Sequence, residues 1–128
     1  MNLQDINFEQ AKLLKQAGFV EHTTKFYDKN GVLTGSLPVN HNLHKDRFSA
    51  VSVAAAIEWI RREKGIYCWV SYHSTAPMMY LANMHWIGKG LAQAFSFKTD
   101  YHESLKQALD KGLYLATNPE KKFAPHDY

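Results

Sequence analysis

The sequence predicts an α+β fold in which three helices pack on an antiparallel sheet. Apolar residues recur with helical spacing in three segments, at about 8–17, 53–64 and 101–116. β-Branched and aromatic residues gather in the segments between them, and strands grouped apart from helices are typical of this class. A length of 128 residues suits one hydrophobic core, so we expect a single domain over 1–128.

Composition and charge exclude several classes of protein. Hydrophobic residues make up 45% and charged residues 21%, which is typical of a globular domain and not of a disordered or collagen-like chain. The formal net charge is +3, and most cations lie near acids, which favours a solvated surface over a nucleic-acid face. The single cysteine excludes an internal disulfide. No secretion signal or membrane-length apolar run is visible, so we expect a cytoplasmic protein.

The first two helices have recognisable ends. Asn7 is the expected N-cap of the first helix, and Gly18 is its left-handed stop. Ser52 and Gly65 have the same two roles in the second helix. Four apolar residues of that second helix share one face: Val53, Ala56, Ile57 and Ile60. Trp59 lies just beside this face, so we expect its side chain to be half exposed.

The β-prone segments predict a hairpin and a group of strands. Two short runs around a turn indicate a hairpin over about 24–34. The polar stretch 35–48, interrupted by Gly, Pro and Asn, is expected to be a loop. Three further strands are expected at about 66–73, 80–87 and 91–97. Because Met, Leu and Ala also favour helices, a helix over 78–95 is the alternative.

The third helix has the clearest apolar periodicity in the chain. Asp100 and Glu103 have the spacing of a capping box at its start. Gly112 lies on the apolar side, where a missing side chain would permit close approach to a sheet. After this helix, residues 119–128 are expected to form a loosely held tail.

Four segments of the chain together carry a resemblance. They read AKLLKQAGF (11–19), FYD (26–28), AIEWIRREKGI (56–66) and YHESL (101–105), the last followed by its helix. In combination they resemble a group of small, uncharacterised proteins from gut bacteria and their prophages or other mobile elements. The resemblance implies a compact α+β fold. It brings no catalytic residue, because none of the segments contains a reactive constellation.

Four histidines are candidates for chemistry. His41 and His44 have a spacing at which two imidazoles on a helix can share a metal. Their polar surroundings argue against a helix, so they are weak metal candidates and we expect a solvated loop and no cofactor. His73 and His85 fall in neighbouring predicted strands and could approach one another as a general base with a partner. No nucleophile motif accompanies them, which favours ordinary sheet histidines.

The aromatic face of the predicted sheet is the strongest functional signal. Alternation along the strand at about 66–73 places Tyr67, Trp69 and His73 on one side, and the helices would cover the other. Tyr and Trp are enriched at binding hot spots. We therefore expect a small non-enzymatic module that binds another protein or a second copy of itself, with Trp86 and Trp59 as further contact residues. The alternative is that the tail or the histidine-rich loop covers this face within the monomer.

Two other classes of function remain open. One is a small enzyme that uses His73 or His85. The other is a nucleic-acid accessory protein, whose weak basic patch would consist of Lys25, Lys29, Arg61, Arg62 and Lys64. Such a protein should lose its affinity for DNA steeply as salt is added.

Overall fold

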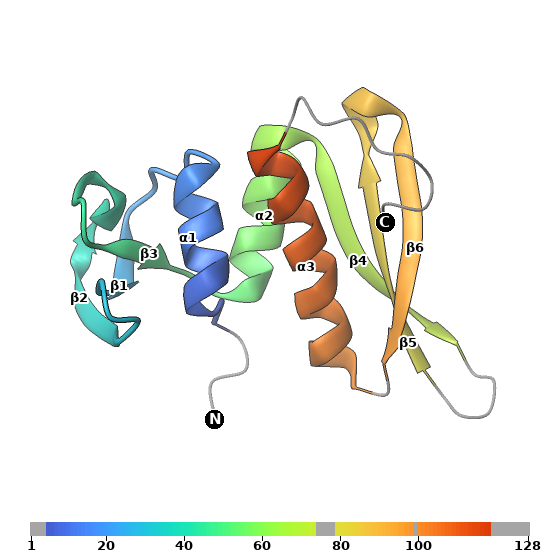
Figure 1. Ribbon diagram of the computed structural model, residues 1–128, viewed down its shortest axis with the longest axis horizontal. Coiled ribbons are helices and arrows are strands. Elements are labelled where there is room, and N and C mark those ends of the chain that lie inside the picture. Colours follow the sequence, from blue (N-terminus) through green and yellow to red (C-terminus); the bar gives the residue numbers. More distant parts are fainter. Residues whose placement is uncertain (1–4, 74–78, 99, 119–128) are drawn as a thin grey trace. The chain divides into compact units, whose positions relative to one another are not determined.

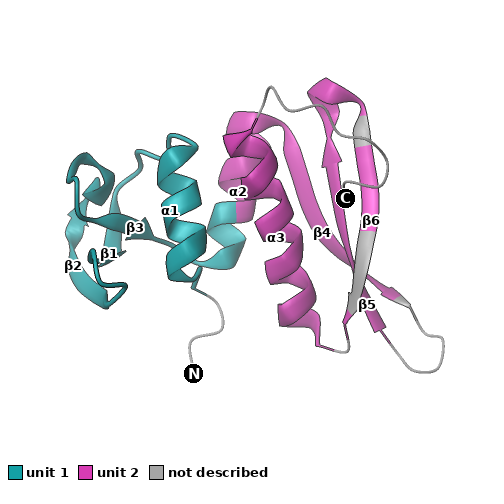
Figure 2. Cartoon of the chain, in the orientation of Figure 1, with its two compact units in different colours: residues 1–56 teal, residues 57–128 magenta. Residues whose placement is uncertain are grey.

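The computed structural model describes residues 5–73, 79–98 and 100–118 (Figure 1). It confirms the α+β class, with three helices and two antiparallel sheets of three strands each. The strand orders are β2-β1-β3 and β4-β5-β6, so the hairpin does not join the other predicted strands in one sheet. The chain divides into two compact units, Met1–Ala56 and Ile57–Tyr128, each of which contains one of the sheets (Figure 2).

The first unit begins with a well-capped helix. Its elements are α1 (Phe8–Gln16), β1 (Thr23–Tyr27), β2 (Leu33–Val39), the 3₁₀ helix η1 (His41–Leu43) and β3 (Phe48–Ala50). The Asn7 side chain accepts a hydrogen bond from the Gln10 amide at 2.8 Å, and the Gln10 side chain accepts one from the Asn7 amide at 2.9 Å. This reciprocal capping box fixes the start of α1. Gly18, at φ +101°, ends the helix as expected.

The expected loop over 35–48 is only partly a loop. β2 continues to Val39, and a third strand, missed from the sequence, starts at Phe48 and pairs antiparallel with β1. Asn42 holds the intervening chain in place. Its side chain donates to the Phe19 carbonyl at 2.8 Å and accepts from the Ser49 amide at 2.8 Å. A polar residue therefore connects the loop to the new strand, which hydrophobic periodicity does not reveal.

Helix α2 (Val53–Lys64) has the predicted bounds and crosses the division between the two units. The Ser52 hydroxyl accepts from the Ala55 amide at 3.0 Å, and Gly65, at φ +69°, ends the helix. Trp59 corrects the expectation of half exposure. It is 5% exposed, because the buried face of α2 is shifted toward Trp59 and leaves Ile57 only partly buried.

The second unit consists of a regular sheet and one long helix. Its elements after α2 are β4 (Ile66–His73), β5 (Met79–Trp86), the 3₁₀ helix η2 (Ile87–Lys89), β6 (Leu91–Lys98) and α3 (Tyr101–Thr117). The described part of 78–95 is therefore extended, not helical, apart from the η2 turn. The β4–β5 ladder is unbroken, whereas the β5–β6 ladder shifts register between Leu81 and Ala82.

Helix α3 packs on one face of this sheet (Figure 1). A Cβ atom at Gly112 would lie 2.5 Å from the Cys68 Sγ, so glycine is what allows this close approach. Burial raises the pKa of the Cys68 thiol to about 12.

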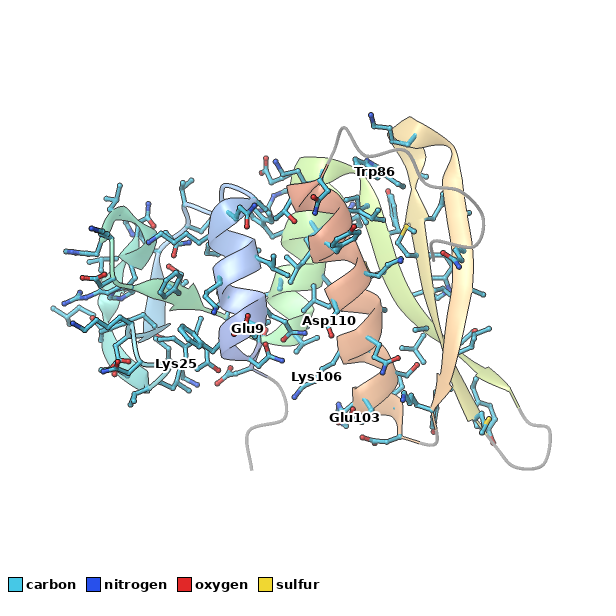
Figure 3. The ribbon with its side chains drawn as sticks, viewed as in Figure 1. Glu9, Lys25, Trp86, Glu103, Lys106 and Asp110 are labelled. Carbon is cyan, nitrogen blue, oxygen red and sulfur yellow. The ribbon has the colours of Figure 1, made fainter. Side chains whose placement is uncertain are left out.

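The charged side chains Glu103, Lys106 and Asp110 project from α3 in Figure 3. The expected tail at 119–128 lies outside the described residues.

Candidate functional site

The face of the β4-β5-β6 sheet turned away from α3 carries the candidate site. Directly opposed residues of neighbouring strands lie on the same face. Tyr67 pairs with His85 and Trp69 pairs with Asn83, whereas Ile66 and Cys68 alternate onto the α3 side. We call this surface the open face and define it by these residues: Tyr67, Trp69, Ser71, Asn83, His85, Ala92 and Ala94.

Two large aromatic side chains of β4 are exposed on the open face. Tyr67 is 40% and Trp69 is 44% exposed, whereas Ile66 and Cys68 on the other face are 0% and 7% exposed. Burying apolar surface is worth about 25 cal/mol per Å², so these rings favour contact with another surface. The structure places Tyr67 and Trp69 on the same side of β4, as predicted, whereas the tail named as an alternative cover lies outside the described residues.

A buried amide supports the open face beside Trp69. Asn83 is 8% exposed. Its Nδ2 donates to the Ser71 hydroxyl at 3.0 Å and to the Leu81 carbonyl at 2.9 Å. The bond to Ser71 ties β5 to β4 beside Trp69, whereas the bond to Leu81 lies within β5. A side chain that is already hydrogen-bonded loses less conformational entropy when a partner binds.

A charged pair borders Tyr67. The Arg61 guanidinium lies 6.0 Å from the centre of the Tyr67 ring. Arg61 also forms a two-point ion pair with Glu58, one turn earlier on α2. The hydrogen bond from Arg61 holds the pKa of the Glu58 carboxyl below its usual range. A polar border around an aromatic centre is the usual anatomy of a protein interface.

Two predicted contact residues do not belong to the open face. Trp86, labelled in Figure 3, pairs with Ile66 and therefore faces α3, where it is 8% exposed. Trp59 is buried as well. Neither indole is available to a partner in this structure, because both lie in the hydrophobic core. The side chain of His73 lies outside the described part of the chain.

The two strand histidines do not form a shared centre. His73 is opposite Met79 and His85 is opposite Tyr67, so they lie six residues apart along the ladder. At about 3.3 Å per residue this separation is about 20 Å. The register therefore argues against the alternative in which neighbouring strands bring these two histidines together, and ordinary sheet histidines remain the prediction. Two residues of adjacent strands lie opposite one another only when the pairing register places them so. The sequence did not predict this register.

The two weak metal candidates, His41 and His44, lie in different environments. His41 is fully buried and its ring stacks on Phe26 at 4.5 Å, whereas His44 is exposed. The described residues contain no cluster of metal-ligating side chains. The expectation of a solvated loop is wrong for His41. Burial, followed by the charge of Arg47, lowers the pKa of its imidazole.

The predicted basic residues are largely engaged with acids. Lys25 pairs with Asp5 at 2.9 Å, Arg61 with Glu58, and Arg62 with Glu63 at 3.3 Å. Lys25 and Lys29 belong to the first unit, and the other three predicted cations belong to the second. These pairs weaken the case for a nucleic-acid surface, because each neighbouring carboxylate repels phosphate.

A pocket in the first unit was missed from the sequence. It has a volume of about 340 Å³ and is lined by Asp5, His22, Thr23, Thr24, Lys25, Ala50, Val51, Ser52 and Ala55. Its two charged groups are the paired Asp5 and Lys25, the latter labelled in Figure 3. The Ser52 hydroxyl is engaged as the cap of α2. The pocket residues come from three separated segments and form no motif, so sequence reasoning had no signal for them.

The chain was also compared with known proteins. No family model, curated protein or solved structure matches it. None of the described helices combines the length and the hydropathy that crossing a membrane requires. The fold and the open face are therefore the basis for any functional proposal.

Proposed function

We propose that this protein is a non-enzymatic interaction module that associates with a second copy of itself through the open face. The observation that supports this proposal is the exposure of Tyr67 and Trp69 on the open face, whereas the other face of β4 is buried at Ile66 and Cys68 and exposed only toward its end, at Tyr72. The small proteins that its segments resemble have no assigned activity, so the proposal rests on the open face alone.

The structure offers less support for the other two classes. An enzyme built on His73 and His85 lacks a common centre, since the register separates them. The Cys68 thiol is no substitute as a nucleophile, because burial raises its pKa to about 12 and the reactive form is the thiolate. The cations of the weak basic patch are mostly paired with carboxylates.

Sedimentation equilibrium over a wide concentration range tests the proposal. We expect the average mass of the wild-type chain to rise toward twice the monomer mass. Trp69→Ser should weaken the association at least about 30-fold, which corresponds to the roughly 2 kcal/mol of an interface hot spot. The matched control is Leu43→Ser, which removes an 82% exposed side chain outside the open face.

Two results would overturn the proposal. One is a wild-type chain that stays monomeric at the highest attainable concentration. The other is an association that Trp69→Ser and Leu43→Ser weaken equally, since the aromatic residue would then have no special role.

A further inference from the structure

Residues 40–47 link β2 to β3 and contain η1, and we call this segment the strap. The Lys15 ammonium of α1 donates to the His44 carbonyl at 2.6 Å and to the Arg47 carbonyl at 2.9 Å. The Asn42 side chain adds the two bonds described above. These polar attachments are exposed or partly buried, and segments held in this way open more readily than a core does.

His41 attaches the strap to the core. Its side chain is fully buried, and its ring stacks on Phe26 with 4.5 Å between the ring centres. The Arg47 guanidinium lies 4.6 Å from the centre of the same Phe26 ring. Histidine is the side chain whose charge changes most readily near neutral pH. The group that fixes the strap to the core can therefore become charged.

The buried imidazole has polar atoms without partners. Neither ring nitrogen forms a hydrogen bond of normal geometry with the described residues. The Leu37 and Thr23 backbones lie close enough to raise the pKa of His41, but burial and the Arg47 charge outweigh them. Burying a polar group without a partner destabilises the folded state, and a phenyl ring of similar size would not have this effect. The closed strap is thus held less tightly than an apolar ring would hold it.

The charges around His41 oppose a further positive charge. Those with the largest effect on its pKa belong to Arg47 and then, more weakly, to His44, and both lower it. α1 contributes the Lys15 ammonium on the carbonyls of the strap, whereas β1 and β2 contribute the backbone groups named above. Asp46, the carboxylate within the strap, is exposed. A protonated ring would therefore be both desolvated and repelled in its closed position.

We propose that the strap is a pH-sensitive switch, which is closed while His41 is neutral and opens when His41 is protonated, with the sheet and α1 still folded. The open state uncovers Phe26, which is 8% exposed in the closed state. This switch does not depend on self-association, because the strap belongs to the first unit and the open face belongs to the second.

Proton binding sets the direction of the switch. The open strap binds a proton at His41 with the ordinary pKa of about 6.5, whereas the closed strap binds this proton only at a lower pH. Above about pH 6.5 the equilibrium constant for opening should not change. As the pH falls from about 6.5 toward the lower pKa of the closed strap, this constant should rise up to about tenfold per pH unit.

Hydrogen exchange of the wild-type chain between pH 7.5 and pH 5 measures this constant. The Ser49 amide, which donates to Asn42 of the strap, is the reporter, and the Leu14 amide within α1 is the internal control. Protection factors, which correct for the exchange rate of a free amide, report the free energy of opening. The Ser49 protection factor should be lower than that of Leu14, and it should fall up to about tenfold per pH unit below about pH 6.5. Low urea concentrations that leave the protein folded should not change it, because a local opening exposes little surface.

His41→Phe removes the titrating group and keeps a ring against Phe26. We expect the Ser49 protection factor at pH 5.5 to be up to about tenfold higher in this variant than in the wild type, and to be independent of pH. His44→Gln is the matched control, since it removes an exposed histidine of the same segment. It should keep the pH dependence of the wild type.

Two results would overturn the switch. One is a His41→Phe chain whose Ser49 amide keeps the wild-type pH dependence, because other groups would then be responsible. The other is a wild-type Ser49 amide with the same protection factor and urea dependence as Leu14, because the strap would then open only when the whole unit unfolds.

Discussion

The contact between Gly112 and Cys68 sets the distance between α3 and its sheet. A Cβ atom at position 112 would lie 2.5 Å from the Cys68 Sγ, so the Cys68 side chain or one of the two backbones must shift. Overpacking a core typically costs about 1–3 kcal/mol. The higher helix propensity of alanine offsets only about 1 kcal/mol of this loss in stability.

We therefore expect Gly112→Ala to lower the free energy of unfolding, by about 1 kcal/mol. Urea denaturation followed by circular dichroism measures this. In a Cys68→Ala background the obstructing sulfur is gone, and the same substitution should be neutral or stabilising. Equal losses in both backgrounds would show that the sulfur contact is not the cause.

His41 makes stability depend on pH. Burial and Arg47 lower its pKa in the folded state, with a smaller effect of His44, while the Leu37 and Thr23 backbones act in the opposite direction. The unfolded chain binds a proton at His41 below about pH 6.5, whereas the folded chain binds this proton only at a lower pH. The contribution of neutral His41 is thus fully present above about pH 6.5 and is lost as the pH falls toward the folded pKa.

We expect the urea concentration at the unfolding midpoint of the wild-type chain to decrease as the pH is lowered from 7.5 to 5.5. His41→Phe keeps a ring against Phe26 and should show a smaller fall over the same interval. His44→Gln changes an exposed histidine and should behave like the wild type. A His41→Phe chain with an undiminished pH dependence would assign the effect to other groups.

At the level of the elements, α1 depends on its capping box. Asn7→Ala removes the bond to the Gln10 amide and leaves the reciprocal bond to the Asn7 amide in place. Loss of such a cap typically costs about 1 kcal/mol. Asn7→Ser retains a cap and should keep most of the stability. The difference in urea midpoint between the two variants measures the cap, and equal midpoints would contradict this role.

The elements that the sequence predicts well are those whose signals are local. All three helices were found because caps, stops and apolar spacing lie within the segment itself. β3 was missed because Phe48–Ala50 becomes a strand only by pairing with β1, which no local pattern encodes. The open face was anticipated from alternation along β4. Predicting that Trp86 faces α3 would have required the strand register. Predicting the pocket would have required the tertiary fold.

At the level of the whole molecule, the division between the units falls inside α2 and not in a linker. Proteases need an extended substrate, so helical bonds resist cleavage even where side chains are exposed. We expect trypsin to cleave after Lys29 and Lys45, which lie in turns, before it cleaves after Arg61, Arg62 or Lys64. Mass spectrometry of a digestion time course measures the order. Early cleavage within α2 would indicate a hinge there.

The shielded sulfur of Cys68 has a practical consequence. It is the only sulfhydryl in the chain and it lies beneath α3, so a chromogenic disulfide reagent can reach it only after α3 lifts from the sheet. The labelling rate then reports how often this layer opens, without any introduced probe. Labelling of Cys68 thus measures the opening rate of the second unit without a mutation.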